Sequence, residues 1–153
     1  MSHKQIILAT DHAGFDAKEA LKEYLIKNRP GCEIKDFGAI SKDERDDYPD
    51  YIAPAAKYIS EHSKEDIVGF IFGGSGEGEA IVANRFRNVR ATVLNCPNLD
   101  LVSLARQHNN ANILSFGARF LDIDFIIRAA TLFLDTEFSE IERHVRRISK
   151  IDL

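Results

Sequence analysis

A glycine-rich segment, GGSGEGEA, carries two carboxylates between a strand-like and a helix-like pattern. It follows the apolar run 67–72 and leads into a helix-like stretch that contains Glu77 and Glu79. Glycine loops at helix starts often hold phosphate on backbone N–H groups. Three known motifs fail here, because Glu79 replaces the last glycine of GxGxxG and the lysine of a P-loop, and Glu77 replaces the last glycine of GxSxG. Since two carboxylates would repel a phosphate, we expect that a phosphate ligand, if the protein has one, binds elsewhere.

The same loop suits proton transfer to and from carbon. Backbone N–H groups at a helix start can stabilise negative charge that develops on a substrate oxygen, while a nearby carboxylate removes a carbon-bound proton. A second interpretation fits the spacing equally well: Glu77 and Glu79 would only complement the positive end of the helix dipole. The spacing alone leaves both interpretations open.

Polar side chains also flank two other predicted strands. Asp11 and His12 follow the first strand in TDHAGF, where such a pair is as often a helix cap and a solvated histidine as a catalytic pair. The segment ARQHNNANILSFGARF supplies His108, Asn109 and Arg119 around the fifth strand. His108 could act as a general acid or base, although a lone histidine at a helix end is more often structural.

The segment SEIERHVRRISK near the C-terminus is the candidate phosphate site. On a helix, Arg143 and Arg147 stand four residues apart with His144 beside them, so one face offers two guanidinium groups and an imidazole. Arg146 points partly away from that face. The alternative is a solvated basic face that complements the helix C-terminus.

Alternating strand-like and helix-like segments are expected to position these side chains. Strands are predicted at 5–9, 32–37, 67–72, 91–95 and 112–116, and helices at 15–29, from 49, and at 79–86, 98–109, 123–134 and 139–151. The pattern predicts a Rossmann-like α/β fold in three layers, with a five-stranded parallel sheet of order 2-1-3-4-5, helices on both faces and an extra C-terminal helix. Ligands of such sheets bind beyond the carboxyl ends of the first and third strands, where Asp11 and the glycine loop stand.

Composition limits the possible functions. The 153 residues are 44% hydrophobic and 29% charged, which predicts one globular domain over 1–153. A formal charge of −4 argues against a general nucleic-acid surface. Cys32 and Cys96 stand far apart and no HxxxH or HExxH spacing occurs, so we expect no disulfide framework and no metal site. The apolar stretch near the N-terminus is too short for a signal peptide or membrane span, which predicts a cytoplasmic protein without membrane contact.

Five ordered motifs together resemble a known family. The segments ATDHAGF, DDYPDY, GGSGEGEAIVANRF, RQHNNANILSFGAR and RHVRRI are similar to those of ribose-5-phosphate isomerase B and its sugar-phosphate isomerase relatives, over residues 6–151. The resemblance implies an aldose-ketose isomerase that interconverts ribose 5-phosphate and ribulose 5-phosphate without metal or cofactor. It also implies a homodimer or homotetramer.

The resemblance assigns the chemistry to the glycine loop. Glu79 is implied to be the base that moves a proton between C1 and C2 through an enediolate. Ser75 and the loop amides of Gly74, Gly76 and Gly78 are implied to hold the oxyanion. Gly73 stands where another branch of the family has a cysteine base, which places this sequence in the glutamate branch.

The resemblance assigns substrate binding to the other segments. Asp11 and His12 are implied to contact sugar hydroxyls, His108 to assist ring opening with Asp11, and Asn109 to line the sugar site. The implied phosphate ligands are Arg119, Arg143, His144 and Arg147. Each site is implied to be composite, with Glu79 and Ser75 from one subunit and His108, Asn109 and Arg119 from its partner. Glu77 departs from the uncharged residue expected between the glycines.

Two alternative functions remain open. A six-carbon sugar phosphate, such as allose or galactose 6-phosphate, would need only a longer distance between base and phosphate clamp. A flavodoxin-like module that binds a nucleotide or flavin is disfavoured by the failed phosphate-loop motifs and by the Glu79 carboxylate.

Overall fold

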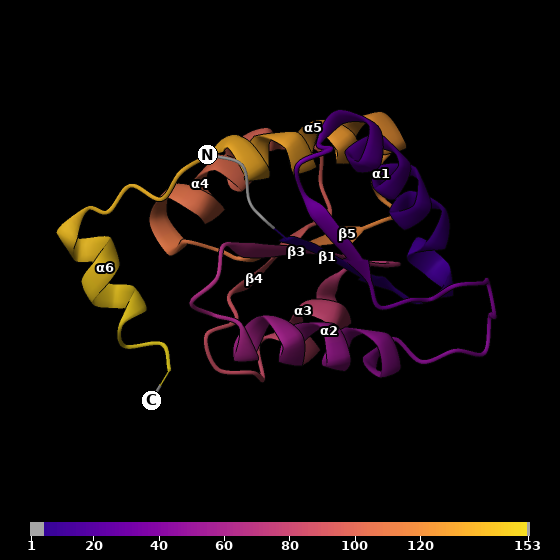
Figure 1. Cartoon of the computed structure of the whole chain (residues 1–153), viewed down its shortest axis with the longest axis horizontal. Coiled ribbons are helices and arrows are strands. Elements are labelled where there is room, and N and C mark those ends of the chain that lie inside the picture. Colours follow the sequence, from indigo (N-terminus) through magenta and orange to yellow (C-terminus); the bar gives the residue numbers. More distant parts are fainter. Residues whose placement is uncertain (1–4, 153) are drawn as a thin grey trace.

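The computed structural model describes residues 5–152, which form one parallel five-stranded sheet between two layers of helices (Figure 1). The strands are β1 (Gln5–Thr10), β2 (Glu33–Asp36), β3 (Ile67–Gly73), β4 (Ala91–Leu94) and β5 (Ile113–Gly117). The helices are the 3-10 turn η1 (His12–Gly14), α1 (Phe15–Asn28), α2 (Pro49–Glu61), α3 (Glu77–Ala83), α4 (Leu99–Asn109), α5 (Ile123–Asp135) and α6 (Glu142–Ile148). The expected α/β class with helices on both faces is confirmed.

The predicted strand order is wrong at one edge. The observed order is β2-β1-β3-β5-β4 rather than 2-1-3-4-5, so β5 pairs with β3 and β4 forms the edge. Burial explains the difference, because all five residues of β5 are buried, whereas three of the four residues of β4 are only half-buried. A strand that is apolar on both faces belongs in the interior of a parallel sheet.

Alternate residues of the central strands supply two separate cores. Ile6 and Leu8 of β1 face the core covered by α1, α4 and α5, whereas Ile7 and Ala9 face the core under α2 and α3. This alternation follows the period of two along a strand. Within residues 5–152, no helix is long and apolar enough to cross a membrane.

The revised order keeps the expected crevice and adds a neighbour to it. From β1 the chain moves to β2 on one side, and from β3 it moves to the edge strand β4 and then back to β5 on the other, so the carboxyl ends of β1 and β3 still form the switch point. Because β5 lies directly beside β3, the segment after β5 reaches the glycine loop. Ala118 N donates to Gly73 O at 2.8 Å, and Arg119 N donates to Gly74 O at 3.1 Å.

Helix α6 lies to one side of the layered body (Figure 1). It is shorter than the predicted helix over 139–151, and it packs against α4. The exposed side chains of α6 are therefore available to contact a surface outside the fold of this chain.

Candidate active site

The glycine loop turns sharply between β3 and α3 and is held by β5. Gly76 has a φ of +80°, a left-handed conformation that side chains rarely adopt, and a Cβ there would lie 3.0 Å from the carbonyl carbon of Phe116. Ser115 Oγ donates to Gly76 O at 2.7 Å from inside the sheet. The sequence did not single out Ser115, because a serine within an apolar strand gives no signal of its loop contact.

Glu79 is the buried carboxyl group of this loop. It stands in the first turn of α3 with only 4% of its surface exposed. A side chain at Gly73 would overlap the Glu79 carboxylate, so the absent Cβ creates the space that the carboxylate fills. Burial raises the pKa of Glu79, and the nearby charge of Asp11 raises it further, against a backbone hydrogen bond that lowers it. A carboxylate that only complemented a helix dipole would not need this burial.

Glu77 points to a different partner. Asn95 Nδ2 donates to Glu77 Oε1 at 2.9 Å and to Ser75 O at 3.2 Å, which ties the loop to the end of β4. Ser75 Oγ accepts from Glu77 N at 3.2 Å. The exposed Glu77 therefore helps to hold the conformation of the loop, because its carboxylate accepts a hydrogen bond from Asn95.

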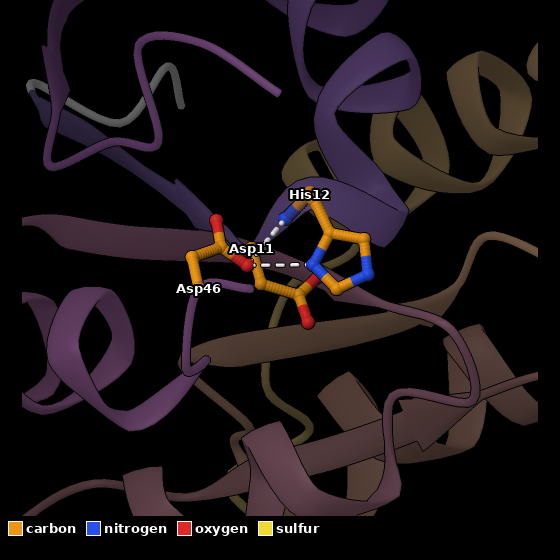
Figure 2. Close-up of side chains that lie close together, drawn as sticks. All are labelled: Asp11, His12 and Asp46. Atoms are coloured by element: carbon orange, nitrogen blue, oxygen red, sulfur yellow. Dashed lines mark hydrogen bonds and ion pairs between the residues drawn. The ribbon is translucent and has the colours of Figure 1, made fainter. Parts of the chain in front are cut away.

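Asp11 and His12 lie at the end of β1, next to an aspartate that the sequence analysis missed. Asp11 Oδ1 accepts from Ala13 N at 2.9 Å, as in the helix-cap interpretation. Asp46 Oδ1 lies 2.6 Å from His12 Nδ1 and accepts from His12 N at 3.2 Å (Figure 2). The hydrogen bond to Asp46 is the largest cause of a raised His12 pKa, and burial opposes it. Asp46 stands in an acidic loop whose many carboxylates gave no reason to choose one.

The three side chains could also hold a metal ion. Asp11, His12 and Asp46 each offer one ligand atom, and these atoms lie within 4.8 Å of one another. Asp11 and Asp46 already accept the hydrogen bonds described above, so a cation would have to replace part of this network.

Arg119 lies against the glycine loop of its own chain. A Cβ on Gly74 would lie 3.0 Å from Arg119 Nη1, and the charge of Arg119 acts against the protonation of His12. This placement differs from the expected grouping with His108 and Asn109, because β5 rather than β4 is the neighbour of β3. Tyr48 covers the other side of the loop: a Cβ on Gly78 would lie 2.7 Å from its Oη.

We call these side chains the carboxyl-end cluster: Asp11, His12, Asp46, Ser75, Glu79 and Arg119. A second group, the α4–α6 cluster, consists of His108, Arg143, His144 and Arg147. The rings of His108 and His144 lie 4.4 Å apart, and Ser139 Oγ lies 3.0 Å from His144 Nδ1. Burial, and then the neighbouring positive charges, lower the pKa of His144. His144 therefore packs on His108 instead of standing beside two arginines on an open face.

The two arginines of the α4–α6 cluster are exposed. Arg146 pairs with Glu142, at 2.6 Å between Nη1 and Oε2, whereas Arg143 and Arg147 form no ion pair with any residue in 5–152. Asn109 ends α4 and lines a cavity of about 320 Å³ together with Arg90 and Asp152. No hydrogen bond, ion pair or ring contact between described residues joins the two clusters.

Comparisons with known proteins agree over nearly the whole chain. A family model described as Ribose/Galactose Isomerase matches residues 6–151. Ribose-5-phosphate isomerase B of Mycobacterium tuberculosis is 34% identical over 149 residues, which cover 97% of this chain and 88% of that protein. The structure of ribose 5-phosphate isomerase from Thermotoga maritima is 39% identical, with a TM-score of 0.86 over 98% of both chains. A structure of ribose-5-phosphate isomerase B from Mycoplasma genitalium with bound ribulose 5-phosphate is 33% identical, with a TM-score of 0.88 over 96% of this chain and 93% of that one.

Proposed function

This chain belongs to the ribose/galactose isomerase family, and on that premise we propose that it interconverts ribose 5-phosphate and ribulose 5-phosphate. The observation that carries the proposal is the buried Glu79 carboxyl, whose pKa is raised, at the carboxyl ends of β1 and β3. A carboxylate of raised basicity in a loop of N–H donors suits proton abstraction next to a carbonyl group.

The proposed reaction moves one proton between two carbons. In the open-chain aldose, the Glu79 carboxylate takes the proton from C2, the C2–H electrons form a C1–C2 double bond, and negative charge develops on O1. The loop around Ser75 stabilises this enediolate. A proton moves from O2 to O1, and the protonated Glu79 returns its proton to C1, which leaves a carbonyl group at C2.

His12 and Asp11 are placed to bind the sugar beside the base. Because Asp46 raises the pKa of His12, the imidazole stays protonated at higher pH than usual and can donate to a substrate oxygen. Asp11 lies close enough to raise the pKa of Glu79, so it also adjusts the basicity of the catalytic carboxylate.

We propose that a partner subunit completes each site in a homodimer. Arg143 and Arg147 are exposed on a helix to one side of the body and form no ion pair with a carboxylate in 5–152, and His108 packs on His144 of the same helix. The partner's Arg143 and Arg147 would join Arg119 at the phosphate, and the partner's His108 would assist ring opening. His144 would hold His108 in position, and the partner's Asn109 would line the sugar site.

Two smaller proposals concern conditions of activity. No disulfide joins Cys32 and Cys96, which suits a reducing compartment and supports a cytoplasmic location. The chemistry described needs only side chains and backbone N–H groups, so we expect activity to persist in a chelator.

The test is an isomerase assay of the purified protein with ribose 5-phosphate, allose 6-phosphate, galactose 6-phosphate and unphosphorylated ribose, with and without a chelator. We expect the highest kcat/KM for ribose 5-phosphate, and a loss of at least about a hundredfold for ribose because charge-assisted contacts to phosphate are missing. A higher kcat/KM for a six-carbon substrate would replace the substrate assignment. Activity lost with the chelator and restored by a divalent ion would replace the proposed mechanism.

A further inference from the structure

A polar cavity lies at the edge of the sheet opposite the carboxyl-end cluster. It measures about 210 Å³ and is lined where β3, β4 and β5 begin, by residues that include Ile67, Arg90 and Asn112. The candidate catalytic residues stand beyond the carboxyl ends of β1 and β3, so this cavity is separate from the proposed isomerase site.

Two guanidinium groups share one wall of the cavity. Arg106, in the last turn of α4, is only 7% exposed; its Nε donates to Thr136 O at 3.1 Å and its Nη1 to Ala111 O at 2.6 Å. Arg90, just before β4, donates from Nε to Asn110 O at 2.9 Å. Asn110 links the pair, because its side-chain oxygen accepts from Arg106 Nη1 at 3.1 Å.

Both guanidinium groups lack a carboxylate partner among the described residues. Their hydrogen-bond acceptors are neutral oxygens, and one face of Arg106 lies over the Phe133 ring at 5.3 Å. Glu65 and Asp66 also line the cavity, and both are exposed to solvent; the charge of Asp66 acts on Arg106 and raises its pKa. Within residues 5–152, the Nη2 atoms of the two arginines donate no hydrogen bond, so donors remain for a ligand.

The electrostatic balance favours an added anion. Burial is the largest cause of the lowered pKa of both Arg90 and Arg106, and the charge of Arg90 lowers that of Arg106 further; the charges of Asp152 and Asp66 oppose these shifts at Arg90 and Arg106 without reversing them. Guanidinium groups nevertheless stay protonated in proteins, so the fold keeps two desolvated positive charges that repel each other. A negative ion between them would relieve both penalties and accept charge-assisted hydrogen bonds.

We propose that the cavity binds a small oxyanion between Arg90 and Arg106. Its volume is below the roughly 300–1,000 Å³ of pockets for drug-sized ligands, which favours a single phosphate or carboxylate group over a nucleotide. The bound ion would join the start of β4 to the end of α4. Binding to the folded state alone would stabilise the protein.

The test compares anion-dependent thermal unfolding of wild type with variants at the cavity. Phosphate, acetate and chloride are titrated at constant ionic strength, which separates a tetrahedral oxyanion, a carboxylate and a general salt effect. Ser63 lines the cavity and is exposed, so Ser63→Glu adds a repelling charge without disturbing the core, and Ser63→Gln is the neutral control of equal size. Arg90→Met removes one ligand.

We expect a saturable rise in Tm with phosphate or acetate beyond that with chloride. The apparent affinity for the oxyanion should fall roughly three- to tenfold in Ser63→Glu and remain unchanged in Ser63→Gln. In Arg90→Met the saturable rise in Tm should be lost. Phosphate bound at the isomerase site would contribute equally to all of these proteins. Equal anion responses in Ser63→Glu and Ser63→Gln would overturn the proposal even if Arg90→Met failed to fold.

Discussion

The carboxyl-end cluster and the α4–α6 cluster differ in how firmly the fold holds them. Glu79 is buried beneath a loop fixed by β3 and β5, whereas Arg143 and Arg147 stand exposed on a seven-residue helix that packs against α4. The first cluster can set the pKa of its base within one chain. In the second, the guanidinium groups of Arg143 and Arg147 form no ion pair with any residue in 5–152, so we expect chemistry to depend on the first cluster and phosphate binding on the second.

The largest expected effect is the loss of turnover when Glu79, the proposed catalytic base of the carboxyl-end cluster, is replaced. Glu79→Gln keeps the size of the side chain but cannot accept a proton, so turnover should fall by about two to four orders of magnitude while KM changes little. Steady-state kinetics with ribose 5-phosphate measures both constants. Glu77→Gln is the matched control and should keep nearly full turnover; near-normal turnover in Glu79→Gln would remove Glu79 from the mechanism.

The next effect tests how the fold holds that base. Gly73→Ala places a methyl group in the volume of the Glu79 carboxylate, so displacement of the base should reduce kcat by about a hundredfold. Gly31→Ala is the control, because a Cβ there meets no atom within 4 Å. Circular dichroism should show both variants folded, and an unchanged kcat in Gly73→Ala would contradict the proposed position of the base.

The α4–α6 cluster should affect binding instead of turnover. Arg143→Gln or Arg147→Gln removes one charge-assisted contact, so KM should rise about tenfold to a hundredfold with kcat largely retained. Arg146→Gln is the matched control, since Arg146 is paired with Glu142. If all three variants kept the KM of the wild type, the basic face of α6 would be an ordinary solvated surface.

Subunit mixing tests whether the two clusters meet across an interface. In a hybrid of Glu79→Gln and His108→Ala subunits, both defects fall in one composite site and the other site is intact. Random mixing makes about half the dimers hybrid, so roughly a quarter of wild-type activity should return after joint refolding. Each variant refolded alone is the control, and hybrids as inactive as both parents would show that His108 acts within its own chain or not at all.

The smallest effect concerns stability and pH. Because the folded-state pKa of Glu79 is raised, the folded protein binds this proton more tightly than the unfolded chain, and stability falls as pH rises from the ordinary glutamate range through the raised value. Glu79→Gln lacks this loss. Its Tm should exceed that of wild type above the raised pKa, and the difference should shrink at lower pH. A variant less stable than wild type at neutral pH would contradict the burial argument.

Local patterns predicted much of the fold and the centre of the site. Alternating apolar runs gave the strands, and the glycine loop with Glu79 stood out because its carboxylates excluded phosphate motifs. The order of β4 and β5 was not predictable from chain order, since it depends on which strand the helices bury on both faces. For the same reason, the sequence placed Arg119 with His108 and Asn109, whereas it lies against the glycine loop of its own chain.

Side-chain pairings were the hardest part to predict. Asp46 reaches His12 across 34 positions of sequence, and nothing in its acidic loop distinguishes it from its neighbours. His144 follows Arg143 directly in a basic segment of the sequence, but its buried ring packs on the ring of His108. Such contacts depend on tertiary packing, and the periodicity of a sequence carries information only on local structure.

The position of β5 between β3 and β4 also sets an order of assembly during synthesis. Strands β1, β2 and β3 can pair once residues up to 73 have emerged from the ribosome, but β4 has no neighbour in the sheet until residues 113–117 have emerged as well. The same late strand carries Ser115 and leads to Arg119, both of which contact the glycine loop. The growing chain therefore contains Glu79, the proposed base, well before it can form the loop's final support, and β4 remains an unpaired strand for that interval.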